Sequence, residues 1–163
     1  MARRVIEQSG LKEWQRWLVS LQNSEIENTQ SRIIRTAGLR ALEHLDDLTP
    51  VRTGRLKGSM SMGSQGNVFK LQTGSRAYVF VGTAVSYAQH INDGFTQKAG
   101  QFVPGYWKGH TFHYKPNHDD GMVLTGKVIP GAHMFEKAMD ELEQDIPNIL
   151  DYEFRRMYQK LFS

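Results

Sequence analysis

Hydrophobic positions change their spacing at one octapeptide, Thr49–Leu56, which reads Thr-Pro-Val-Arg-Thr-Gly-Arg-Leu. Upstream of it apolar residues recur at helical spacing, and downstream they alternate as in strands. Pro50 disfavours the α conformation at the residue before it, so a helix arriving through Leu48 is expected to stop there. Gly54 allows a turn before the alternating pattern begins. We therefore expect a helical half and a sheet half on either side of this segment.

Two helical segments are predicted before the octapeptide. Residues 1–23 contain a short amphipathic arm with Trp14 and Trp17, which either packs on its own domain or docks on a neighbouring subunit. Ser24-Glu-Ile-Glu27 has the pattern of a capping box, so a separate long helix is expected to begin at Ser24. The apolar stripe of this helix consists of Ile26, Ile33, Ile34, Ala37, Ala41, Leu42 and Leu45.

The alternating pattern predicts an antiparallel meander of three short strands, over Leu56–Met62, Val68–Gln72 and Ala77–Thr83. A short helical turn over Tyr87–Gly94 follows, closed by its glycine. Residues 95–129 are interrupted by glycine and proline but are too aromatic for a disordered linker. They predict an inserted loop or hairpin, with a candidate last strand over Met122–Ile129.

The last segment, residues 130–163, is predicted to form a C-terminal helix with an apolar stripe from Met134 to Phe162. Pro147 is expected to kink it. Because about thirty residues at 1.5 Å each span roughly 45 Å, the end beyond the proline is expected to fold back or to project towards a partner. The chain is thus predicted to be one α+β domain over 1–163. An antiparallel sheet of about four strands packs against a long helix of the N-terminal half and a long C-terminal helix.

Composition excludes several protein classes. The 163 residues contain no cysteine, so there is no disulfide, thiolate zinc site or cysteine nucleophile, which fits a cytoplasmic protein. No apolar run approaches the roughly 20 residues of a membrane helix. The net charge of +3 is uneven, because residues 131–163 hold four basic against seven acidic residues. Scattered basic residues give little support for nucleic-acid recognition.

The strongest candidate for chemistry is a histidine loop, formed by His110, His113 and His118 with Asp119 and Asp120 beside them. Such side chains bind divalent metals and activate water, so a metal-dependent hydrolase or nuclease is the alternative function. Their spacing matches no established motif, and the glycine-rich loop lacks the rigid support of a metal site. No serine elbow or phosphate loop is present either. We therefore predict no enzymatic activity, no catalytic residue, no metal and no cofactor.

Three motifs in order resemble the tail-completion (neck, head–tail joining) family of tailed phages and prophages. They are Thr49-Pro-Val-Arg-Thr-Gly-Arg-Leu56, Tyr87-Ala-Gln-His-Ile-Asn-Asp-Gly94 and Pro130-Gly-Ala-His-Met-Phe-Glu-Lys-Ala138. The positions that match the family pattern are Thr49, Pro50, Thr53, Gly54, Leu56, Tyr87, Ala88, Gly94, Pro130 and Phe135. The resemblance covers residues 25–145. The chain departs from the pattern at Asn92, where the family often has an acid, and in the aromatic insertion, the N-terminal arm and the extended C-terminal helix.

The resemblance implies a structural subunit of the phage or prophage neck that joins the head connector to the tail as part of an oligomeric ring.

 The ring is hexameric by resemblance, and the family members are not enzymes. The expected partners are further copies of the chain, the head connector or head-closure protein, and the tail tube or tail terminator protein. DNA passes nearby without sequence-specific binding, and no membrane is involved. The expected location is the host cytoplasm during assembly and then the virion neck or tail. The residues predicted to contact partners are Phe102, Tyr106, Trp107, Phe112, Tyr114, Trp14 and Trp17.

Overall fold

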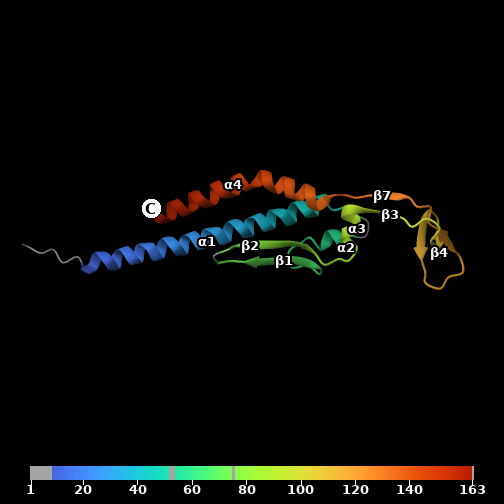
Figure 1. Ribbon diagram of the computed structural model, residues 1–163, viewed down its shortest axis with the longest axis horizontal. Coiled ribbons are helices and arrows are strands. Elements are labelled where there is room, and N and C mark those ends of the chain that lie inside the picture. Colours follow the sequence, from blue (N-terminus) through green and yellow to red (C-terminus); the bar gives the residue numbers. More distant parts are fainter. Residues whose placement is uncertain (1–8, 52–53, 75, 163) are drawn as a thin grey trace, which may run out of the picture.

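The computed structural model describes residues 9–51, 54–74 and 76–162, and it is an extended α+β structure, as predicted (Figure 1). Two long helices, α1 (Ser9–Leu48) and α4 (Met134–Phe162), lie along one another. Two short helices, α2 (Arg55–Gly58) and α3 (Ala88–Asp93), lie near the end of this pair. The strands are antiparallel and belong to three small sheets.

The first sheet is a hairpin of β1 (Asn67–Gln72) and β2 (Tyr78–Thr83), close to its predicted boundaries. The second is a ribbon of β3 (Gly94–Thr96) and β7 (Val128–Pro130). The third has β4 (Phe102–Lys108) between β5 (Thr111–Tyr114) and β6 (Gly121–Val123). The strands therefore do not form one sheet of about four. The β3–β7 ribbon leads the chain away from the helices before β4 begins, so β4–β6 cannot pair with β1 and β2 (Figure 1).

One helix, rather than an arm and a second helix, runs from Ser9 to Leu48. The predicted start at Ser24 is wrong, because residues 11–37 contain no glycine or proline that would interrupt the helix. The predicted end before Pro50 is confirmed. At this end the Thr49 hydroxyl donates a hydrogen bond to the carbonyl of Leu45, at 2.5 Å, which satisfies one of the last helical acceptors.

The predicted strand over Leu56–Met62 is wrong, because this segment forms α2 and a turn. Leu56 and Met60 both point into the core, with exposed fractions of 4% and 0%. Residues four apart share a face in a helix as well as in a strand, so the pattern fits both. Gly54 precedes the helix with φ of 74°, and its carbonyl accepts a hydrogen bond from the Gly58 amide at 2.7 Å.

The hydrophobic core lies where α1, α2, α3 and the start of α4 meet, and it consists of Leu45, Leu56, Met60, Val85, Ala88, Met134 and Ala138. The β1–β2 hairpin packs beside it on α1 at Gly38. A Cβ atom on this glycine would lie 2.8 Å from Val79 Cγ2 and 2.9 Å from Phe69 Cε2. The missing side chain therefore allows the hairpin to approach the helix closely.

Polar pairs align α1 and α4 as antiparallel neighbours. Lys160 pairs with Glu25, Glu153 pairs with Arg32 (Nε–Oε2, 2.6 Å), and Glu141 pairs with His44 (Nδ1–Oε2, 2.9 Å). For each step of one residue forward along α1, the paired residue in α4 therefore lies one residue earlier in the sequence. The first turns of α1 consequently extend beyond the end of α4, by roughly 20 Å at 1.5 Å per residue (Figure 1).

The helix α4 continues through Pro147 to Phe162 and bends along its length (Figure 1). The segment beyond the proline neither folds back on α4 nor projects freely, because it packs on α1. Ile149 and Glu153 are buried in this contact, with exposed fractions of 9% and 5%. Part of the apolar stripe predicted for α4 therefore has its partner within the same chain.

Candidate interaction surfaces

Two of the three motifs line one cleft of about 490 Å³. Its lining residues are Pro50, Val51, Gly54, Arg55 and Leu56 of the first motif, with Tyr87 and Ile91 of the second. Thr53 lies outside the described residues. The third motif supplies Met134 and Ala138 to the core, where they meet Leu56 and Ala88. Phe135 is half-buried against the same core.

Asn92 joins the second motif to the third. Its side-chain Oδ1 accepts a hydrogen bond from the Phe135 amide at 3.0 Å, which satisfies a donor in the first turn of α4. Its Nδ2 donates to both carboxylate oxygens of Glu136, at 3.1 Å each. Gly131 packs against the Asn92 carbonyl so closely that a Cβ atom would lie 2.2 Å from the oxygen. Asn92 is therefore a buried structural link between the second and third motifs.

Residues 97–127, which we call the distal flap, contain β4, β5 and β6 and lie at the end of the molecule beyond the β3–β7 ribbon (Figure 1). Four predicted contact residues are exposed on it, with fractions of 44–65%: Phe102, Tyr106, Trp107 and Tyr114. Phe112 is half-buried and packs edge-on against the Trp107 ring, at 5.3 Å between centroids. Gly105 is the one buried residue between Gly94 and His133, a range that the structure describes in full. The distal flap thus has no hydrophobic core of its own.

The histidine loop belongs to this aromatic surface. His113 stacks on Tyr106, with the ring centroids 5.4 Å apart and an interplanar angle of 14°. His118 lies on the same tyrosine at 5.8 Å, and its Nδ1 is 3.3 Å from the Asp120 amide. His110 is exposed in the turn between β4 and β5. In the described part of the chain, no three His, Cys, Asp or Glu side chains are arranged to hold a metal ion.

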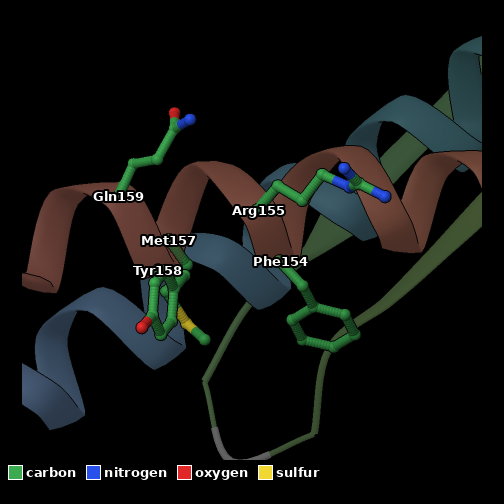
Figure 2. A pocket seen from close by; sticks show the side chains of 5 residues that line it. All are labelled: Phe154, Arg155, Met157, Tyr158 and Gln159. Carbon is green, nitrogen blue, oxygen red and sulfur yellow. The ribbon is translucent and has the colours of Figure 1, made fainter.

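The two halves of α4 expose different surfaces. In the first half, Met139 and Ile146 are 45% and 39% exposed and lie two turns apart on one face. The second half forms one side of a cleft of about 550 Å³, lined by Phe154, Arg155, Met157, Tyr158 and Gln159. Phe154 and Tyr158 extend to one side of the helix, and Arg155 and Gln159 extend away from them (Figure 2). The side chains of Trp14 and Trp17, on α1, lie outside the described residues, so their predicted contacts stay predictions.

A buried carboxylate lies near the end of the helix pair. Glu25 is 6% exposed, and the hydrogen bond from Lys160 lowers its pKa below the ordinary value of 4.5, although burial acts in the opposite direction. Its second oxygen, Oε2, is buried without a hydrogen-bond partner among the described residues. The ion pair is therefore part of what holds the last turn of α4 against α1.

Comparison with known proteins finds similarity to the Bacillus subtilis (strain 168) protein "Uncharacterized protein YqbI". It is 34% identical over 138 residues, which cover 80% of this chain and 75% of the relative. The chain belongs to the YqbI family. No protein-family model matches it, and no solved structure matches it. The name of the relative assigns no activity.

This YqbI-family chain exposes far more surface than a compact protein of its size. Its accessible area is 12651 Å², whereas a compact monomer of 18.7 kDa exposes about 8,300 Å². Even in extended form, the twelve residues outside the description would account for only about 1,900 Å² of this difference. None of the described helices is long and apolar enough to cross a membrane. The excess area includes the aromatic rings of the distal flap.

Proposed function

We propose that this member of the YqbI family is a structural subunit of a phage or prophage neck, which joins the head connector to the tail as part of an oligomeric ring. The observation that carries the proposal is the excess of exposed surface over that of a compact monomer. Once the area of the twelve residues outside the description is subtracted, this excess accessible area is about 2,500 Å². A stable interface buries about 800 Å² on each partner, and a subunit in a ring has two neighbours. The excess is large enough for both contacts and for a further partner.

The three motifs support a phage neck, rather than another kind of oligomeric assembly, as the structure that this chain helps to build. They are separated in the sequence, yet the segments Thr49–Leu56, Tyr87–Gly94 and Pro130–Ala138 pack around one core and one cleft. Motifs that meet in this way act as one architectural unit, which supports reading the resemblance as a shared fold. Their role is to fix the start of the β3–β7 ribbon, and hence the place of the distal flap. The aromatic surface on that flap is where we expect a partner.

The proposal is tested by co-expression with the connector and tail proteins from the same phage or prophage. The gene neighbourhood identifies these proteins, and neighbours encoding a portal or tail tube are expected. Electron microscopy of the purified complex should show ring density between connector and tail. Failure to join either component under any condition would contradict the proposal.

A metal titration tests the alternative hydrolase or nuclease function. We expect no stoichiometric binding of zinc or manganese, and no metal-dependent hydrolysis that His110→Ala or His113→Ala would change. Metal-dependent hydrolysis that these two substitutions abolish would favour the enzyme.

A further inference from the structure

The distal flap is basic as well as aromatic. Residues 97–127 contain two aspartates and four lysines, Lys98, Lys108, Lys115 and Lys127. No ion pair involves any of these lysines in the part of the chain that the structure describes. The flap therefore presents uncompensated positive charge beside exposed aromatic rings.

The first half of α4 has the complementary character. Residues 134–145 contain five acidic residues and one lysine. Glu141 and Asp145 are turned towards His44 on α1, at 2.9 and 3.0 Å. Asp140 and Glu143 are exposed and form no ion pair within the described residues. We call the exposed face formed by Met139, Asp140, Glu143 and Ile146 the outer stripe.

We propose that the distal flap of one copy packs on the outer stripe of a second copy. The inference rests on the proposed function, because it names the contact that would build the ring. The aromatic rings of the flap cover Met139 and Ile146, and sulfur–aromatic contact is favourable. In this contact, the flap lysines of one copy lie close to Asp140 and Glu143 of the second copy. Because the two surfaces differ, the contact is head-to-tail, and such contacts close into a ring when the rotation between copies allows it.

Charge selects this face over the other exposed surface of α4. The second half also exposes Phe154 and Tyr158, but there Arg155 is paired with Asp151, Lys160 is paired with Glu25, and Arg156 adds a further positive charge. The acids of this half, Asp151 and Glu153, are already paired, so a basic flap is attracted instead to Asp140 and Glu143 of the first half, which are unpaired among the described residues. Within one copy the flap is held away from the body by the β3–β7 ribbon (Figure 1). The outer stripe is therefore open to a neighbour's flap.

Cysteine cross-linking tests the contact in the full chain, which has no cysteine of its own. Thr111→Cys places a thiol on the exposed flap, and Gln144→Cys places one beside the outer stripe. When the two variants are mixed and oxidised, with one carrying a tag, dimers between different variants should exceed dimers within either variant at least threefold. Gln65→Cys, at an exposed glutamine before β1, is the matched control and should give only a background yield with Thr111→Cys.

Charge reversal provides the second measurement. Lys108→Glu with Lys115→Glu should lower the mixed yield about tenfold, which corresponds to about 1.4 kcal/mol, and Asp140→Lys with Glu143→Lys should do the same. When the Thr111→Cys chain carries the two lysine reversals and the Gln144→Cys chain carries the two acidic reversals, the yield of mixed dimers should be restored. These side chains are exposed, so the far-ultraviolet circular dichroism spectrum should not change.

The outcomes separate this inference from the proposed function. A dominant dimer between two Thr111→Cys chains, a yield equal to the control, or a yield insensitive to charge reversal would overturn the contact. If the flap cross-links only to a connector or tail protein, the contact is wrong but the neck function stands. If the two copies cross-link as expected but never join a connector or tail, the contact stands and the neck function is wrong.

Discussion

Gly38 offers the sharpest test of how the β1–β2 hairpin is seated. It lies within α1, where alanine normally stabilises a helix over glycine by up to about 1 kcal/mol. At this position, however, the added Cβ would lie 2.8 Å from Val79 Cγ2 and 2.9 Å from Phe69 Cε2. The valine methyl is fixed close to the β2 backbone, so it can move away only if the strand moves. For Gly38→Ala, the higher helix propensity of alanine is therefore stabilising, whereas the close contacts with the hairpin are destabilising.

The sizes of the packing cost and of the propensity gain decide whether the substitution stabilises or destabilises the protein. Overpacking of a closely packed contact costs about 1–3 kcal/mol, which exceeds the gain in helix propensity. Gly38→Ala should therefore destabilise the protein by about 1 kcal/mol, and Gly38→Leu should destabilise it further. Gly58→Ala is the matched control, because Gly58 is also helical but has no atom within 4 Å of the Cβ position. The control should be neutral or slightly stabilising.

Urea unfolding followed by circular dichroism at 222 nm measures the difference. With a slope of about 2 kcal/mol per molar urea, the midpoint for Gly38→Ala should fall by about 0.5 M. In thermal unfolding, a loss of 1 kcal/mol corresponds to about 2–4 °C for a chain of this length. A Gly38→Ala protein that is stabilised as much as Gly58→Ala would show that the hairpin does not pack against α1 as described.

Three further predictions concern the core, the link to α4 and the helix pair. Leu45→Ala should destabilise the protein by about 2–5 kcal/mol in urea unfolding, because Leu45 is fully buried; a loss below about 1 kcal/mol would contradict its place in the core. Asn92→Asp should destabilise by about 1–3 kcal/mol at pH 7, because it sets a carboxylate against those of Asp93 and Glu136, and adding Glu136→Gln should recover part of this loss. Because the Lys160 hydrogen bond lowers the pKa of Glu25 below 4.5, it contributes stability above that pH that is lost as pH falls through the lowered value. Glu25→Gln should accordingly flatten the pH dependence of the urea midpoint below pH 4.5, and an unchanged slope would show that this pair does not contribute.

The sequence correctly predicted the elements whose ends are marked by a proline or a glycine. Pro50 fixed the end of α1, and glycine-bounded alternation identified β1 and β2. The capping pattern at Ser24 misled, because such a pattern also occurs inside a helix that begins earlier. The strand predicted at Leu56 failed because two residues four apart, Leu56 and Met60, satisfy both the strand period and the helix period. Short windows do not separate these two periods.

The candidate surfaces were partly predictable. The concentration of aromatic residues in the glycine-rich insertion indicated an exposed contact region, and Trp107 and Tyr114 are indeed exposed. The apolar pattern of α4 placed Met139 and Ile146 on its stripe, but it did not indicate which part of the stripe α1 would leave uncovered. One antiparallel helix covers only a narrow seam of its neighbour, so the wider part of the stripe remains uncovered. The Asn92–Phe135 hydrogen bond joins residues 43 apart in sequence and has no local signal.

The antiparallel course of α1 and α4 has a practical consequence for imaging. The chain enters α1 and leaves α4 at the same end of the molecule, opposite the distal flap (Figure 1). A bulky reporter fused at either of these ends would stay clear of the flap. It would therefore act as a polarity marker, showing in electron micrographs which way each subunit points along the axis of an assembled particle.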